Sequence, residues 1–181
     1  MQDIKIQLRD GRTALIREAV PDDAVRLLRF LDAVTGETDF LSMGPGDFDW
    51  PEEKERRFIE DHRQADNKLL LVAEIEGRIV GILGYTGDDR PRLCHTGEFG
   101  ITISRGCWGL GLGTTLIQRM IVWARTSGVV RKIGMRVRHD NERALRLYDH
   151  FGFAREGTIT RYFAVAGRFY DAYLMGLEID P

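Results

Sequence analysis

The spacing of apolar residues along the chain predicts a mixed order of strands and helices. Alternating or β-branched apolar runs predict strands over 13–18, 69–75, 79–85, 96–104, 132–138, 155–164 and 168–177. Apolar residues three and four positions apart predict helices that start near Pro21 and Pro51 and others over 111–127 and 141–151. Some strands alternate with helices and others follow one another as hairpins. We therefore expect an α/β (α+β) fold with a mixed, mostly antiparallel sheet of six or seven strands and helices on both faces.

Residues 36–50 carry no regular pattern, and Gly44, Pro45 and Gly46 interrupt them. We expect an irregular segment there, between the first two helices. The sequence shows no internal repeat, low-complexity tract or long linker. A single domain over residues 1–181 is therefore the expected organisation, at a length that ordinary domains reach.

Composition narrows the class of protein. Apolar residues make up 43% of the chain, and 26 basic against 28 acidic residues give a formal net charge of −2. A nucleic-acid-binding face usually shows as a basic excess, so we expect no nucleic-acid partner. The first residues lack an apolar signal segment and no apolar run is long enough to span a bilayer, so we expect a cytoplasmic protein without a membrane partner. Cys94 and Cys107 lack metal-ligand spacing, and we expect no metal site.

A glycine-rich turn joins the strand over 96–104 to the helix over 111–127. It runs Trp108-Gly109-Leu110-Gly111-Leu112-Gly113-Thr114, and its glycines allow a tight turn and a close approach to a ligand. No capping side chain stands at the start of the helix, so its first N–H groups are expected to point outward. Together with the helix dipole they form an anion site that suits a pyrophosphate. The alternative is that the glycines only shape the connection.

Two nucleotide-binding motifs do not fit this turn. A P-loop ends in Gly-Lys followed by Ser or Thr, whereas Gly113 is followed directly by Thr114. A dinucleotide fingerprint needs a glycine at its sixth position, where this chain has Thr114. It also needs an acid about 20 residues later, where the run is Arg131-Lys132-Ile133. The residues present in the turn and after it therefore exclude both nucleotide-binding motifs.

A second motif lies on the helix over 141–151. Asn141 suits a helix start, and Ala144, Leu147, Tyr148 and Phe151 share one face at i, i+3, i+4, i+7 spacing. Taken alone, this face is typical of core packing with the Tyr148 hydroxyl at its edge.

Together, the two motifs resemble those of the GNAT superfamily of acetyl-CoA-dependent N-acetyltransferases. The glycine turn is similar to their pyrophosphate loop, and Asn141-x-x-Ala144-x-x-Leu147-Tyr148-x-x-Phe151-Gly152-Phe153 looks like their second conserved block. Their loop usually starts with Gln or Arg, where this chain has Trp108. A Trp-Gly start is similar to the branch that includes ribosomal-protein, polyamine and amino-acid acetyltransferases. The resemblance extends over residues 13–178 in element order and is sharp from Glu98 to Phe153.

The resemblance implies a reaction and a cofactor site. An amine that has lost a proton to a base attacks the thioester of acetyl-CoA directly, within a ternary complex. The expected cofactor contacts are the strand backbone at Ile101, Thr102 and Ile103, the turn at Gly109, Leu110, Gly111, Leu112, Gly113 and Thr114, and Asn141. A backbone N–H of the strand would stabilise the oxyanion.

The resemblance also implies the groups that move protons. Tyr148, protonated at neutral pH, would give a proton to the departing thiolate and contact the cofactor. Glu98, on the strand before the turn, is the first candidate base, with a solvent-facing carboxylate as the equal alternative. Glu37 and Asp39 are further candidates. We expect surface or structural roles for the three histidines that no nucleophile or metal pattern accompanies: His95, His139 and His150.

The acceptor is expected between residues 35–50 and the final strand pair near 161–170. The acids of the first region, Glu37, Asp39, Asp47 and Asp49, suit a cationic amine. A small amine, amino acid or polyamine is therefore the expected acceptor, with a protein N-terminus or lysine as the alternative. A non-catalytic acyl-CoA sensor is the alternative from another class, and it would not need Tyr148. The resemblance also allows a homodimer.

Overall fold

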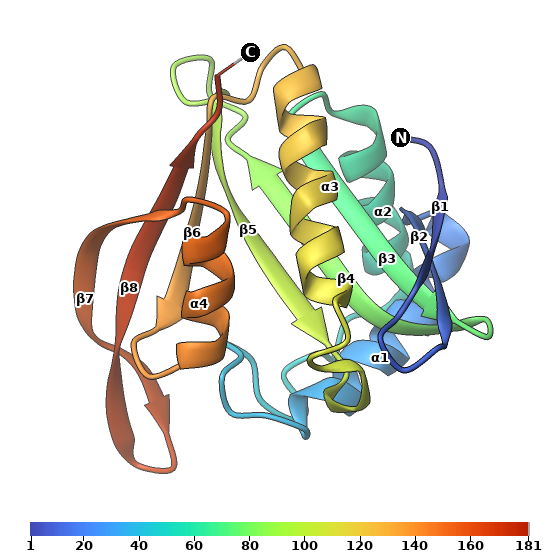
Figure 1. Ribbon diagram of the computed structural model, residues 1–181, viewed down its shortest axis with the longest axis horizontal. Helices are drawn as coiled ribbons and strands as arrows, with labels where there is room; N and C mark the ends of the chain where they lie inside the picture. Colours follow the sequence, from blue (N-terminus) through green and yellow to red (C-terminus); the bar gives the residue numbers. More distant parts are fainter. Residues whose placement is uncertain (181) are drawn as a thin grey trace.

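Eight strands form one open sheet in the computed structural model, which describes residues 1–180 (Figure 1). The strands are β1 (Ile4–Gln7), β2 (Thr13–Glu18), β3 (Lys68–Ile75), β4 (Arg78–Gly87), β5 (Thr96–Ile103), β6 (Lys132–Arg138), β7 (Ala154–Val165) and β8 (Arg168–Glu178). Their order across the sheet is β1-β2-β3-β4-β5-β6-β8-β7. Neighbours are antiparallel except β5 and β6, which run parallel. The predicted mixed, mostly antiparallel sheet is confirmed.

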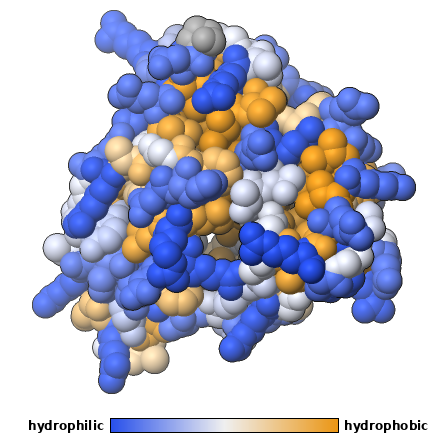
Figure 2. Space-filling model, in the orientation of Figure 1, coloured by the Kyte–Doolittle hydropathy of each residue, from blue (hydrophilic) through white to orange (hydrophobic). Residues whose placement is uncertain are grey.

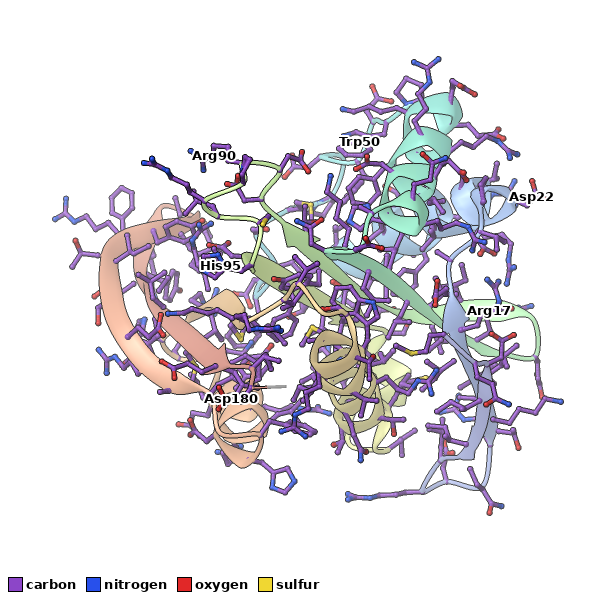
Figure 3. All side chains as sticks on the ribbon, turned by 90° about the horizontal axis from the view of Figure 1, so that it is seen from above. Arg17, Asp22, Trp50, Arg90, His95 and Asp180 are labelled. Atoms are coloured by element: carbon purple, nitrogen blue, oxygen red, sulfur yellow. The ribbon has the colours of Figure 1, made fainter. Side chains whose placement is uncertain are left out.

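Helices cover both faces of this sheet, as the sequence predicted. They are α1 (Ala24–Thr35), α2 (Glu52–Gln64), α3 (Leu112–Thr126) and α4 (Glu142–His150), with short 3₁₀ turns η1 (Pro21–Asp23) and η2 (Arg105–Cys107). Seen from above, α1 and α2 lie on one side of the sheet and α3 and α4 on the other (Figure 3). Each side has its own apolar cluster, and β3 contributes to both, so all of its residues are buried. No helix within residues 1–180 has the length and apolar content that crossing a membrane requires.

The sequence-based prediction of six or seven strands was wrong because it missed β1. This strand is only four residues long, Ile-Lys-Ile-Gln, and pairs only with β2 at one edge of the sheet. An edge strand needs only one apolar face, and an alternation of apolar and polar residues over four positions predicts a strand only weakly. Ile4 lies opposite Ile16, and that contact exists only once β2 is in place.

A buried ion network fastens the start of α1 to the sheet. Arg17 on β2, labelled in Figure 3, donates to both carboxylate oxygens of Asp23 at 2.7 and 2.8 Å. Arg26 donates to Asp23 at 2.9 Å, and both arginines also contact Glu74 on β3. Only 2% of the Asp23 side chain is exposed. The network therefore fixes the start of α1 against the sheet, and the irregular segment 36–50 follows the end of this helix.

Candidate active site

Strands β5 and β6 pair over only three residues and then separate. The pairs are Thr96–Lys132, Gly97–Ile133 and Glu98–Gly134. Beyond Glu98 the edge of β5 that faces β6 has no strand partner in the part of the chain that the structure describes, although β4 pairs with the other edge as far as Ile103. The open stretch over 99–103 is roughly 13 Å long at about 3.3 Å per residue, and its free backbone groups form a template for an extended ligand. Residues 101–103, which were predicted to contact the cofactor, lie on this stretch. On the face of the molecule that carries α3 and α4, the surface is hollowed between these two helices (Figures 1 and 2).

The glycine turn lies at the far end of the open stretch. Gly109 and Gly111 have left-handed φ angles of +78° and +94°, and Gly111 is the N-cap residue of α3. Within residues 1–180, no side chain caps the first turn of this helix. After Trp108, the next amide that donates to another group of residues 1–180 is that of Thr115, which bonds Gly111 O at 3.1 Å. The amides of residues 109–114 are therefore free within residues 1–180, and together with the helix dipole they present a positive potential that suits an anion.

The carbonyl groups of this turn are tethered on the opposite side, by the connection between β1 and β2. Arg9 donates from its side chain to Gly109 O at 3.2 Å and from its amide to Leu110 O at 3.3 Å. Arg12 Nη2 donates to Gly106 O at 2.9 Å. Because N–H and C=O point in opposite directions across a trans peptide, these bonds aim the amides of the turn away from β1 and β2. The sequence carried no sign of this contact, since the partners lie 94 and 100 residues apart.

Side chains along the turn divide between the core and solvent. Leu112 is buried, so only its backbone groups can face a ligand, and the partly buried Leu110 packs against the same core. The Thr115 hydroxyl donates to Gly111 O at 3.2 Å. Thr114 is exposed, and its hydroxyl has no partner within residues 1–180.

Tyr148 lies at the point where β5 and β6 separate. Its ring packs edge-on against Phe99, with centroids 5.8 Å apart, and against Phe153 at 5.9 Å. Phe99 is the first β5 residue beyond the last pair with β6. Tyr148 is buried, with 4% of its surface exposed, and its hydroxyl has no hydrogen-bond partner in the described part of the chain. Burial raises the pKa of Tyr148, which keeps the hydroxyl protonated at neutral pH.

Glu98 lies at the same fork but on the opposite face of the sheet. Successive strand residues point to opposite faces, and the neighbouring Phe99 faces Tyr148. Arg136 Nη2 donates to Glu98 Oε1 at 2.6 Å, and Arg136 Nη1 donates to the Tyr162 hydroxyl at 3.1 Å. The Glu98 side chain is 50% exposed. The sequence did not reveal Arg136 as a partner, because only the register of β6 beside β5 brings the two side chains together.

Asn141 serves as the N-cap of α4. Its side-chain oxygen accepts a hydrogen bond from the Ala144 amide at 3.2 Å, so the helix-start role is confirmed. The side-chain nitrogen of Asn141 has no partner within residues 1–180. Its contact with a cofactor arm stays a prediction.

A cavity of about 850 Å³ lies between the irregular segment and the tip of the β7–β8 hairpin. Residues 35–39, 41–45, 47 and 162–166 line it, which are the two regions where the acceptor was expected. The lining includes Glu37, Asp39 and Asp47 and no lysine or arginine. Tyr162 belongs to the lining and accepts the hydrogen bond from Arg136, so the cavity adjoins the Glu98 side of the fork.

The two further base candidates are engaged by other groups. Glu37 accepts a hydrogen bond from the first amide of η2 at 2.5 Å. Asp39 lies 3.3 Å from Arg138 Nη1, which also donates to its carbonyl oxygen at 2.9 Å. Arg138 is buried with its guanidinium 4.2 Å from the ring centres of both Phe40 and Tyr170. This arginine therefore joins the irregular segment to β6 and β8.

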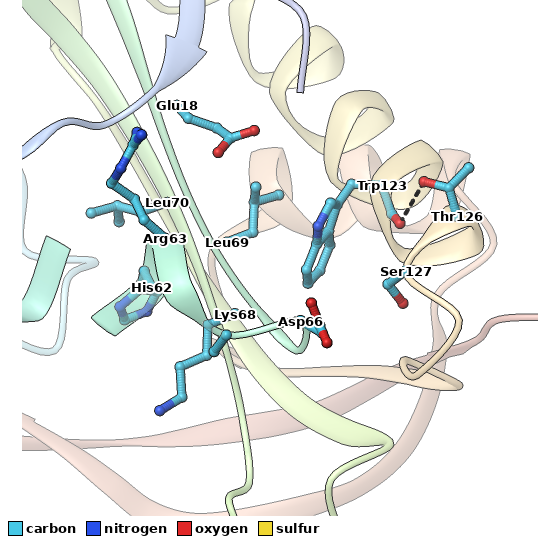
Figure 4. Close-up of a pocket in the computed structure, with 11 residues that line it drawn as sticks. Glu18, His62, Arg63, Asp66, Lys68, Leu69, Leu70, Trp123, Thr126 and Ser127 are labelled. Carbon is cyan, nitrogen blue, oxygen red and sulfur yellow. Dashed lines mark hydrogen bonds between the residues drawn. The ribbon is translucent and has the colours of Figure 1, made fainter. Parts of the chain in front are cut away.

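A smaller cavity, of about 320 Å³, lies at the other end of α3 (Figure 4). Trp123 and Ser127 from the end of that helix line it, together with residues around the start of β3. Lys68 in its wall is paired with Asp61 at 2.8 Å and Asp89 at 3.0 Å. The helix presents carbonyl groups at this end, so the cavity lacks the free amides that mark the other end.

Comparison with known proteins agrees with this geometry. The profile of the acetyltransferase (GNAT) family matches residues 36–153. The L-amino acid N-acetyltransferase AaaT of Escherichia coli is 35% identical over 105 residues, which cover 58% of this chain and 65% of that protein. The spermidine N(1)-acetyltransferase of Vibrio cholerae is 27% identical over 128 residues, 71% of each protein. The chain thus spans somewhat less than two thirds of AaaT.

Solved structures show the same relationship in three dimensions. An acetyltransferase of the GNAT family from Streptococcus pneumoniae is 38% identical, with a TM-score of 0.90 over 92% of this chain and 99% of that chain. The Salmonella typhimurium protein YncA, solved with its cofactor acetyl-CoA, is 21% identical with a TM-score of 0.79 over 92% and 94% of the two chains, and shows the shared fold. By its matched profile, its sequence identity to relatives and its fold, this chain belongs to the GNAT acetyltransferase family.

Proposed function

We propose that this chain transfers the acetyl group of acetyl-CoA to the amine of a small acceptor, by direct attack within a ternary complex. One observation carries the proposal: free amides and the Tyr148 hydroxyl lie at two ends of one open strand edge. Acetyl-CoA has a diphosphate, an extended pantetheine arm with amide groups, and a thioester in that order. The amides of 109–114, the open edge over 99–103 and Tyr148 match these three parts in the same order.

The side chains at the fork suit the proton transfers of this reaction. Bound acetyl-CoA would supply an activated carbonyl and a thiolate leaving group. Tyr148 holds its proton at neutral pH and presents it beside the fork, where the departing sulfur needs one. Glu98 Oε1 is held by Arg136, whereas Oε2 has no partner within residues 1–180. We assign Glu98 Oε2 to take the proton of the acceptor amine, directly or through a water.

The cavity of about 850 Å³ is assigned to the acceptor. Of its acids, Asp39 is paired with Arg138, whereas Glu37 and Asp47 have no basic side-chain partner within residues 1–180. These two carboxylates favour a cationic amine over a molecule with a carboxylate beside the amine. By their names, the Escherichia coli and Vibrio cholerae relatives act on L-amino acids and spermidine, which both carry aliphatic amines. Of these two classes, the acidic lining supports the polyamine, and a protein N-terminus is the other candidate acceptor. A cytoplasmic location and a homodimer stay predictions from the sequence.

Release of free CoA in the presence of an acceptor panel tests the proposal. Purified protein is incubated with acetyl-CoA and polyamines, amino acids, simple amines or peptides, and thiol formation is followed. We expect the fastest release with a polyamine. Tight binding of acetyl-CoA without acceptor-dependent release for any amine would instead identify a sensor and refute the enzyme.

Tyr148→Phe tests the proton donor within the same assay. The change removes only a hydroxyl that has no protein partner, so packing against Phe99 and Phe153 is retained. We expect kcat to fall by about 10²–10⁴-fold with the dissociation constant of acetyl-CoA unchanged. Tyr173→Phe on β8 is the matched control, since that hydroxyl also lacks a partner in the described chain. Full activity in Tyr148→Phe would show that the thiolate leaves without this donor.

A further inference from the structure

Arg143, the second residue of α4, is a cation that no acid neutralises. Within residues 1–180 its guanidinium forms no hydrogen bond or salt bridge, and partial burial lowers its pKa from the ordinary value. Arg146, one turn further along the same helix, differs because it pairs with Glu142 at 3.1 Å. An unpaired arginine among acid-paired neighbours has its full donor set available for a ligand.

Arg143 lies directly beside the glycine turn. A Cβ built on Gly109 would lie 4.0 Å from Arg143 Nη2. The guanidinium carbon lies 4.9 Å from the centre of the Trp108 ring. Contact with an aromatic face holds a guanidinium in place without using its N–H groups, which remain free to donate.

The turn itself offers partial charges only. Residues 108–114 include no basic side chain, so the turn's own positive potential comes from its amides and the helix dipole. A diphosphate carries full negative charges and is bound more tightly when an arginine fork donates to it as well. Arg9 also contacts this turn without an acid partner, but its guanidinium donates to Gly109 O on the carbonyl side of the turn. Arg143 contacts the turn with a guanidinium that donates to no group within residues 1–180.

We propose that Arg143 is a cofactor-binding residue, whose guanidinium donates to the diphosphate of acetyl-CoA while Trp108 holds it in position. The inference rests on the proposed function, because the diphosphate belongs to the proposed co-substrate. It adds a side chain from α4 to a site otherwise built from the backbone before α3. The sequence motif did not single out this residue.

Calorimetric titration with acetyl-CoA tests the assignment without any need for turnover. We expect Arg143→Gln to weaken acetyl-CoA binding about 10- to 100-fold, because it removes a charged hydrogen-bond donor. The affinity of Arg143→Lys should lie between those of Arg143→Gln and the wild type, because lysine keeps the charge but lacks the planar guanidinium that donates two hydrogen bonds. Arg146→Gln makes the same charge change on the same helix and should bind like the wild type. Equal affinities for Arg143→Gln and the wild type would overturn the proposal.

Two acetyl-CoA fragments identify the contacted group. Acetyl-dephospho-CoA keeps the diphosphate and lacks the 3′-phosphate, so Arg143→Gln should weaken its binding by the same factor as that of acetyl-CoA. S-acetylpantetheine has no phosphate, and NMR titration in the millimolar range should show equal binding to both proteins. If Arg143→Gln lost affinity for intact acetyl-CoA alone, the contact would be with the 3′-phosphate. If it also lost affinity for S-acetylpantetheine, the substitution would have disturbed the site in general. Either result overturns the assignment. If the wild type bound no acetyl-CoA, the proposed function itself would fail, and that outcome is distinct from both.

Discussion

Substitutions at Gly111 test whether an anionic phosphate binds at the start of α3. Gly111 is the N-cap residue of α3 with φ +94°, and a Cβ there meets no atom within 4 Å. A side chain at this position therefore enters the open space in front of the free amides. Asn and Asp tolerate the left-handed backbone better than other residues with a side chain. Gly111→Asn and Gly111→Asp thus differ by one charge in nearly the same shape.

The size of the effect follows from the distance to the ligand. Two unit charges about 5 Å apart repel by about 3 kcal/mol at an effective dielectric constant of about 20. Since about 1.4 kcal/mol is a factor of ten, Gly111→Asp should bind acetyl-CoA about 100-fold more weakly than Gly111→Asn. The free energy of unfolding should instead be higher for Gly111→Asp than for Gly111→Asn, because an acidic side chain at a helix N-terminus contributes about 0.3–1 kcal/mol of stability. Weaker binding by an equally or more stable protein cannot result from misfolding.

Calorimetric titration and thermal unfolding measure the two quantities on the same samples. Gly128→Asp is the matched control, since Gly128 also has a left-handed φ, of +73°, and no atom within 4 Å of a built Cβ. It lies just past the opposite end of α3, where no phosphate is proposed. Equal affinities for the Asp and Asn variants at position 111 would show that no anion sits at the start of this helix.

Three further changes probe other parts of the structure. Asp23→Asn should cost about 1–3 kcal/mol of unfolding free energy in a urea titration, because it removes the buried carboxylate that accepts from Arg17 and leaves Glu74 as that arginine's ion-pair partner. Burial alone raises the pKa of Asp23, but hydrogen bonds led by that of Arg17 hold it below its ordinary value. The stabilisation is therefore present above about pH 3.9 and lost as the pH falls through the lower folded-state pKa, so the two proteins should converge in acid. Arg138→Met should raise KM for the acceptor and leave acetyl-CoA binding unchanged, since Arg138 holds the irregular segment of the acceptor cavity; a parallel loss of acetyl-CoA affinity would contradict this role. Glu98→Gln should lower kcat/KM by about 10²–10⁴-fold, and an unaltered pH–rate profile would place the base elsewhere.

Local sequence determined most of the helices and strands, and within the site it determined the glycine turn and the helix that carries Tyr148. The glycine turn predicted an uncapped helix, and the structure has one, because capping depends on residues that adjoin in the chain. The Asn141 cap and the apolar face with Tyr148 followed from spacing along one helix for the same reason. β3 was recognised because a strand buried on both faces contains a continuous apolar run, here over residues 69–73. Where the signal was short and one-sided, as in β1, it failed.

Tertiary structure alone decided how these parts meet. The divergence of β5 from β6 after Glu98 is a property of strand register, and no local pattern encodes it. The same register sets Arg136 beside Glu98, and the β1–β2 connection tethers the glycine turn through Arg9 and Arg12. Arg143 differs from other surface arginines only in what surrounds it. These contacts join residues far apart in sequence, so their energies depend on the assembled sheet and not on neighbours in the chain.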